Sequence, residues 1–134
     1  MIPRYSRIPI TEIWSSKSKF QIWLDIEIAA LQAMEKLSLA PKGLANKFKK
    51  KSKINVKKIH MIESKVHHDL IAFLMSVSEK IGKDSSFLHK GMTSSDILDT
   101  CFNLQLAQSG KILIKDIEEI LKILKKKSFK YKKT

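Results

Sequence analysis

The chain has 134 residues, of which 43% are hydrophobic and 29% are charged, and its formal net charge at pH 7 is +13. This hydrophobic content supports a packed core and excludes a disordered chain, while the length corresponds to about one domain. The lone Cys101 excludes an internal disulfide and a cysteine-based zinc cluster, and it favours a reducing, cytoplasmic location.

Only three prolines and four glycines interrupt the sequence, which favours a mainly helical, all-α protein. Residues 1–15 are predicted to form an extended arm with a short turn of helix after Thr11. The arm carries charges and prolines but no apolar core, so we expect no signal peptide. No stretch of the chain approaches the roughly 18 apolar residues of a membrane span.

The first long helix is predicted over residues 17–39, after an N-cap at Ser15 or Ser16. Pro41 is expected to end this helix and to occupy the first turn of the next, over residues 41–50. Apolar side chains recur along the long helix at steps of three and four residues, as on the buried face of a helix: Phe20, Trp23, Leu24, Ile28, Leu31 and Met34.

Two further helices are predicted before a loop over residues 83–92. Asn55 predicts the N-cap of the first helix, which carries Val56, Ile59 and Ile62 on one face. The second helix is predicted over residues 68–81 and ends at Gly82. Its apolar stripe consists of Leu70, Phe73, Leu74, Val77 and Ile81.

The last predicted helix begins at Thr93 or Ser94 and continues to about residue 127. Helices in globular proteins average roughly 11–12 residues, and a helix this long needs partner helices to cover its apolar side chains. The sequence supplies none after it. We therefore predict a small N-terminal helical domain over residues 1–92 and, over residues 93–134, the first long helix of a central helix bundle, partly uncovered.

The charge has two interpretations, since 26 basic residues face 13 acidic ones. The first interpretation is a basic helical module that binds nucleic acid. The second is that lysine is the ordinary surface residue of this protein. Two observations favour the second: arginine is nearly absent, and no aromatic residues lie between the lysines of the runs. We expect no nucleic-acid partner. The runs are Lys49–Lys51, Lys57–Lys58, Lys125–Lys127 and Lys132–Lys133.

Three segments carry polar residues that a structural helix bundle does not require. Arg4 and Tyr5 pair a cation with a phenol hydroxyl on the arm, where they can clamp an anion. His67, His68 and Asp69 start a helix, and the helix dipole favours the acidic residue there. Adjacent histidines point to different sides of a helix, so they are a poor metal pair.

The third segment follows His89 and brings the hydroxyls of Thr93, Ser94 and Ser95 to a helix N-terminus. The free backbone N–H groups and the positive dipole end suit a carboxylate or a phosphate. N-capping explains the position, but it needs one hydroxyl and not three. These residues predict an anion-binding helical domain, with neither a metal nor a cofactor.

The segment HKGMTSSDILDT, residues 89–100, resembles the first of three signature regions of the fumarase/aspartase superfamily, most closely that of the adenylosuccinate lyase family. The opening MIPRYSR resembles that family's N-terminus, and FQIWLDIEIAALQAM resembles its first long helix. The stretch ESKVHHDLIAFLMSVSE resembles its segment around a His-Asp pair. The resemblance covers essentially all of the chain, and the other two signature regions have no match in it.

The resemblance implies an all-α fold whose central bundle forms a homotetramer with active sites shared between subunits. It implies β-elimination of fumarate from N6-succinyl-AMP to give AMP, and from the succinylated aminoimidazole-carboxamide ribotide, in purine nucleotide biosynthesis. The expected partner is thus a small succinyl-nucleotide. A structural helical protein that retains lyase-like segments, such as a decayed gene product, is a further alternative.

The resemblance also implies roles for individual residues. Arg4 and Tyr5 match the arm that contacts the nucleotide, while Thr93 and Ser94 match contacts to the substrate anion. In the catalytic set, His89 matches a second active-site histidine.

The His-Asp pair of the family matches His68 and Asp69, with His68 expected to support the phosphate and the acid histidine. His67 stands where the family usually has arginine, so a permanent cation becomes a group that titrates near neutrality. The family's general-acid histidine and catalytic serine have no counterpart among these residues. The isolated chain is therefore predicted to be inactive.

Overall fold

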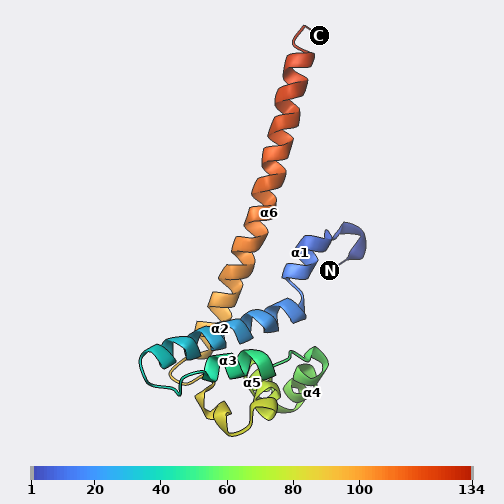
Figure 1. The fold of residues 1–134 in the computed structure, drawn as a ribbon. Helices are drawn as coiled ribbons and strands as arrows, with labels where there is room; N and C mark the ends of the chain where they lie inside the picture. The colour runs from blue at the N-terminus through green and yellow to red at the C-terminus, as the bar shows by residue number, and fades with distance from the viewer. Residues whose placement is uncertain (1, 134) are drawn as a thin grey trace.

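The computed structural model describes residues 2–133, which form α-helices and short 3-10 helices and no strand. Helices α2 to α5 pack together at one end of the molecule, and α6 rises from them as a long rod with α1 beside its lower part (Figure 1). The all-α prediction is confirmed. The bounds are η1 Pro3–Tyr5, α1 Ile8–Ile13, α2 Ser16–Lys36, α3 Leu44–Lys51, α4 Val56–Val66, α5 Asp69–Ile81, η2 Gly82–Phe87 and α6 Ser94–Lys130.

The centre of the core is an aromatic cluster between α2 and α5. The Trp23 ring lies edge-on to both Phe20 and Phe73, with centroid distances of 5.3 and 5.5 Å. All three side chains are almost completely buried, and Ile59 of α4 and Phe48 of α3 are buried with them. Because aromatic side chains bury large apolar areas, this cluster fixes how α2 to α5 pack.

The first three turns of α6 belong to the same core. Ile97, Cys101 and Gln105 recur at four-residue steps and are buried. The Gln105 side-chain amide donates to the carbonyl of Ile13 at 2.7 Å, which joins α6 to the end of α1. A division of the chain between residues 92 and 93 stays a prediction.

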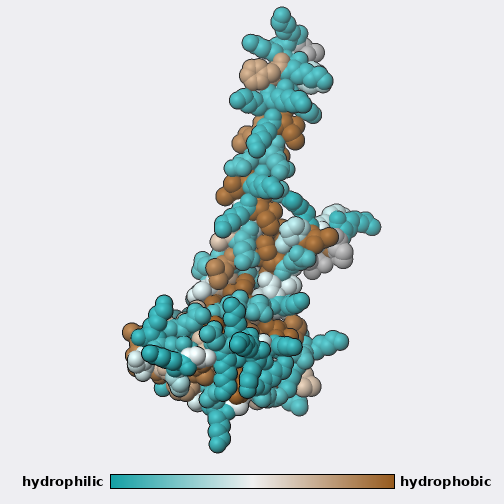
Figure 2. All heavy atoms as spheres, in the orientation of Figure 1, coloured by the Kyte–Doolittle hydropathy of each residue, from teal (hydrophilic) through white to brown (hydrophobic). Residues whose placement is uncertain are grey.

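Beyond Gln105, α6 extends away from α2 to α5, with α1 beside part of it, and many of its apolar side chains are about half exposed. Figure 2 shows these hydrophobic residues scattered along the projecting rod between hydrophilic ones. The exposed apolar residues of this stretch are Leu106, Leu113, Ile114, Ile117, Ile120, Leu121, Ile123, Leu124 and Phe129.

We expect the purified chain to self-associate through this stretch, since a series of exposed apolar side chains along one helix favours contact with a partner. Light scattering over a concentration series measures the effect. Replacing Ile117 and Leu121 by glutamine should reduce the association. The control is Met61→Gln on α4, where Met61 is 55% exposed and Ile117 is 57% exposed. This change should leave the association unchanged, because Met61 lies outside the exposed stretch of α6. A compact monomer at high concentration would contradict the expectation.

Several helix ends differ from the sequence prediction. Helix α1 begins at Ile8, before Thr11, with Pro9 in its first turn. Helix α2 ends at Lys36 and not at residue 39, because Ser38 takes a left-handed backbone conformation with φ of 58°. Left-handed residues do not continue a right-handed helix.

The next helix, α3, does not begin at Pro41. Its N-cap is Gly43, whose φ of 84° lies in the region that only glycine enters at no steric cost. Residues 82–87 of the predicted loop form the 3-10 helix η2, and α6 continues to Lys130. The predicted caps Ser15, Asn55 and Gly82 are confirmed.

Candidate functional site

The arm that carries Arg4 and Tyr5 continues into α1, which lies beside α6 (Figure 1). Both side chains are exposed. The Arg7 guanidinium pairs with Asp116 of α6, and the Trp14 indole N–H donates to the Ser109 hydroxyl at 3.0 Å. These contacts attach the arm to the middle of α6, away from the His67–Asp69 segment at the junction of α4 and α5.

His67 and His68 occupy different structural positions, as expected for adjacent residues. His67 ends α4 with φ of 53°, a left-handed conformation. His68 is the N-cap of α5, and its Nδ1 accepts a long hydrogen bond of 3.5 Å from the N–H of Ile71. Asp69 follows in the first turn of α5, where the helix dipole favours a carboxylate. Both histidine side chains are exposed.

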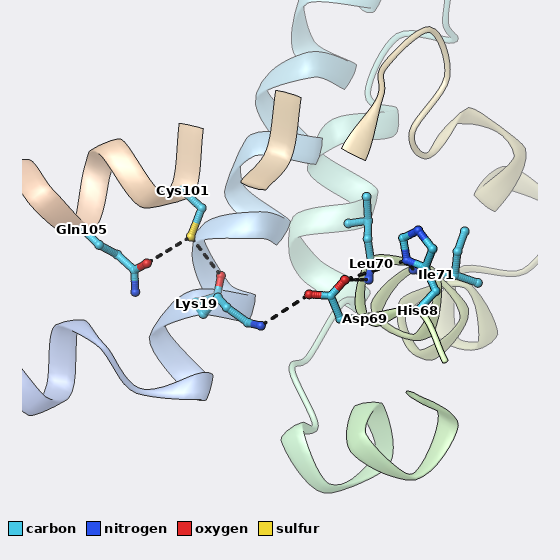
Figure 3. A network of polar contacts seen from close by, with 7 residues as sticks. All are labelled: Lys19, His68, Asp69, Leu70, Ile71, Cys101 and Gln105. Carbon is cyan, nitrogen blue, oxygen red and sulfur yellow. Dashed lines mark hydrogen bonds and ion pairs between the residues drawn. The ribbon is translucent and has the colours of Figure 1, made fainter. Parts of the chain in front are cut away.

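The Asp69 carboxylate connects α5 to α2 (Figure 3). Its Oδ1 accepts the Leu70 N–H at 2.7 Å, and its Oδ2 lies 3.7 Å from the Lys19 ammonium of α2. The same ammonium lies over the Trp23 ring, 4.7 Å from its centroid. A lysine beside the carboxylate offsets its negative charge, so an anion can approach His68 without facing an uncompensated Asp69.

The start of α6 contacts the same part of α2 through Cys101. Its Sγ lies 3.8 Å from the Lys19 carbonyl and 3.6 Å from the side-chain oxygen of Gln105 (Figure 3). Burial raises the pKa of the Cys101 thiol. It therefore serves as a small packed residue that holds α6 against α2, which in turn carries Lys19.

His89 is held by a buried carboxylate from α2. Glu27 is 1% exposed, and its two oxygens contact His89 at two places: Oε2 accepts the backbone N–H at 2.8 Å, and Oε1 lies 3.0 Å from Nδ1 of the ring. Burial raises the pKa of Glu27, while the hydrogen bonds from His89 act in the opposite direction. His89 itself has φ of 57°.

Thr93 and Ser94 lie at the N-terminus of α6, four and five residues after His89. Thr93 is the N-cap, and the Asp96 carboxylate accepts its backbone N–H at 2.8 Å, as in a capping box. Thr93 is exposed and Ser94 is partly exposed, so both hydroxyls can reach solvent or a ligand. Capping accounts for Thr93 but not for Ser94.

These residues form separate clusters within one chain. Among residues 2–133, no hydrogen bond or ion pair joins Arg4 or Tyr5 to the segment His67–Asp69. Within this range, none joins Arg4, Tyr5 or the segment His67–Asp69 to Thr93 or Ser94 at the start of α6. A groove of about 640 Å³ lies elsewhere, between α1, α2 and α6. Its lining is Pro9, Glu12, Ile13, Ser15, Lys17, Ser18, Gln21, Ile22, Gln108 and Ile112.

The surface lysines are partly engaged in ion pairs. Lys47 of α3 pairs with Asp84 of η2, and Lys58 of α4 pairs with Glu79 of α5. Exposed pairs of this kind contribute little to stability, but they reduce the free positive charge beside the lysine runs. Within the described part of the chain, no helix is both long enough and apolar enough to cross a membrane.

Comparison with known proteins places the chain in a family. The profile of a family described as "Lyase" matches residues 5–134, which is nearly the whole chain. The chain belongs to the lyase family of the fumarase/aspartase superfamily. The lyase chain is 39% identical to adenylosuccinate lyase of Thermotoga maritima over all 134 residues. It spans 31% of that relative's length.

A solved structure supports the fold of this lyase chain. The crystal structure of a fumarate lyase from a Mesorhizobium species superposes with a TM-score of 0.77 over 84% of the chain and 27% of the other protein. The sequences are 22% identical in this comparison, so it bears on the fold alone. The all-α arrangement of the chain is therefore that of a known lyase.

Two polar residues of the lyase chain that contact the predicted site are not among the residues predicted from the sequence. Lys19 and Glu27 both lie on α2, which the apolar pattern marks as a core helix. A signal for Glu27 existed: it is four residues after Trp23 and four before Leu31, in the middle of the buried stripe. A charged residue at such a position is rarely buried without a partner.

Proposed function

We propose that this chain supplies the substrate-anion part of an adenylosuccinate lyase active site. The reaction eliminates fumarate from N6-succinyl-AMP to give AMP, and from the succinylated aminoimidazole-carboxamide ribotide, in cytoplasmic purine nucleotide biosynthesis. The observation that carries the proposal is the start of α6, where Thr93 and Ser94 present hydroxyls at the N-terminus of a 37-residue helix beside His89. The 39% identity to the Thermotoga adenylosuccinate lyase supports it.

The chemistry explains why donors at this place are useful. A base removes a proton next to a carboxylate of the succinyl group, and an acid protonates the departing nitrogen. Negative charge develops on that carboxylate during proton removal, and preorganised donors stabilise it in the transition state. Thr93 and Ser94 contribute hydroxyl donors, and the unsatisfied N–H groups of the α6 N-terminus add a positive field.

In this proposal the other predicted residues bind the nucleotide part of the substrate. Arg4 and Tyr5 contact the nucleotide from the arm, and His68 supports the phosphate, with Asp69 and Lys19 fixing the start of its helix. His67 is the departure from the family pattern. Its left-handed backbone holds it at the end of α4.

The separation of the clusters supports an active site shared between subunits. The contacts that hold the arm are made by Arg7 and Trp14 to α6, while His68 lies at the junction of α4 and α5 and, among residues 2–133, shares no hydrogen bond or ion pair with the arm. The exposed apolar stretch of α6 offers the surface for a helix bundle with other copies. We therefore propose a homotetramer in which different subunits contribute these clusters to each site.

The proposal is tested by a chimera in which this chain replaces the matching part of the Thermotoga adenylosuccinate lyase. The chimera should release fumarate from N6-succinyl-AMP, measured by the absorbance of the product. A second chimera with Thr93→Val and Ser94→Ala keeps similar side-chain volumes but lacks both hydroxyls, and serves as the control. Failure of a folded, tetrameric chimera to release fumarate above this control would contradict the proposal.

A further inference from the structure

The most strongly constrained polar contact in the described chain is the one between Glu27 and His89. The carboxylate is 1% exposed and lies among the buried apolar residues of α2. It reaches across to a segment 62 residues away in the sequence and contacts both the backbone and the ring of one residue, at 2.8 and 3.0 Å. Among residues 2–133, no other residue is held at two points by one buried side chain.

Such an arrangement is costly to build. A buried carboxylate loses its hydration, and an isoleucine or leucine at the same position would pack against the core without that loss. The left-handed backbone of His89 adds strain, because its φ of 57° is unfavourable for a residue with a Cβ. Helix packing alone requires neither a buried carboxylate nor a left-handed histidine. We therefore look for a role of this contact in the candidate functional site.

The two contacts together determine the state of the imidazole. The hydrogen bonds from His89 oppose the effect of burial on the pKa of Glu27 and favour its ionised form. An ionised carboxylate only accepts hydrogen bonds, and one of its oxygens already accepts the His89 N–H. The oxygen beside the ring therefore accepts as well, which requires a proton on Nδ1. In the neutral imidazole, Nε2 then carries the lone pair.

We propose that Glu27 is a positioning residue that fixes the ring orientation and the Nδ1–H tautomer of His89. The inference rests on the proposed function in one respect, namely that His89 faces substrate in the lyase reaction. With Nδ1 bound to Glu27, the ring offers Nε2 to the substrate. Neutral His89 accepts a hydrogen bond there, and protonated His89 donates one while Glu27 balances its charge.

A purely structural role for Glu27 makes a different prediction. If the carboxylate only satisfied the His89 N–H and held the turn before Thr93, its loss would lower stability and leave the ring free. The ring would then adopt the Nε2–H tautomer that an unconstrained histidine side chain prefers. The tautomer of His89 separates the two roles, and it does not depend on catalysis.

The test is the nitrogen NMR spectrum of the His89 ring in the ¹⁵N-labelled 134-residue chain, recorded above the pH at which its histidines titrate. The variants are Glu27→Leu, which removes both acceptors, and Glu27→Gln, whose amide offers one acceptor and a competing donor. The control is Glu35→Gln on the same helix. Glu35 accepts the Ala45 N–H at 2.6 Å, so this change also removes a charge and weakens a cap.

We expect the Nδ1–H tautomer to dominate in the unsubstituted chain and in Glu35→Gln. In Glu27→Leu the ratio of Nδ1–H to Nε2–H should fall at least tenfold, since a hydrogen bond to a charged acceptor is lost. In Glu27→Gln the ratio of Nδ1–H to Nε2–H should also fall. This second variant tests the inference if Glu27→Leu does not fold. A dominant Nε2–H tautomer in the unsubstituted chain, or an unchanged ratio in Glu27→Gln, would overturn the inference.

The outcomes for this inference and for the proposed function are separable. The tautomer is read in the isolated chain without substrate, whereas the proposed function is read as fumarate release by the chimera. If the tautomer depends on Glu27 but the chimera is inactive, Glu27 positions His89 for a site other than that of the lyase. If the tautomer does not depend on Glu27 but the chimera is active, the inference about Glu27 is wrong and the proposed lyase function stands.

Discussion

Replacing Thr93 and Ser94 together by alanine should lower kcat/KM of the chimera for N6-succinyl-AMP at least tenfold. Each hydroxyl lost from a charged acceptor costs about 1.5–3 kcal/mol, and about 1.4 kcal/mol corresponds to a decade in rate. Loss of the Thr93 cap costs only about 1 kcal/mol of stability. A folded but strongly impaired enzyme is therefore the expected result, measured by kinetics and a thermal melt on the same protein.

A matched control separates capping from substrate binding. Ser15 is the N-cap of α2, where its hydroxyl accepts the Ser18 N–H at 3.1 Å. Ser15→Ala should lower Tm to a similar extent as loss of the Thr93 cap and leave kcat/KM nearly unchanged. If the Thr93 and Ser94 double variant behaved like Ser15→Ala, with lower Tm and unchanged efficiency, these hydroxyls would only cap the helix.

The isolated 134-residue chain should release no fumarate from N6-succinyl-AMP. The reaction needs an acid and a base, and the family's general-acid histidine and catalytic serine match none of these residues. General acid–base catalysis contributes roughly 10²–10⁴-fold for each group, so the loss of both removes most of the rate. The measurement is a long incubation with the chimera as the positive control. Turnover by the isolated chain would show that it holds its own acid and base.

The helices of this chain are readily predicted because their signals are local. The three- and four-residue spacing of Phe20, Trp23 and Leu24 on α2 specifies a buried helix face, and Ser15 and Asn55 cap the helices that follow them. The errors lie where the backbone becomes left-handed. Ser38 and Gly43 end and start helices through φ values that side-chain hydrophobicity does not encode.

The candidate site is less predictable, because its contacts join distant segments. Thr93 and His68 can be found from the sequence, because each is a polar residue at a predicted helix start. Glu27 and Lys19 contact His89 and Asp69 only after α2 packs against the later helices. The place of Glu27 between Trp23 and Leu31 on the apolar stripe is visible in the sequence, but its partner 62 residues away follows from the fold alone.

The most direct test of this account is a crystal structure of the chimera with AMP and fumarate bound. We predict that a fumarate carboxylate lies within hydrogen-bond distance of the Thr93 and Ser94 hydroxyls and that the AMP phosphate lies beside His68. The Nε2 atom of His89 should face the ligand while Glu27 holds Nδ1. Ligands bound in the chimera without contact to any of these residues would contradict the account.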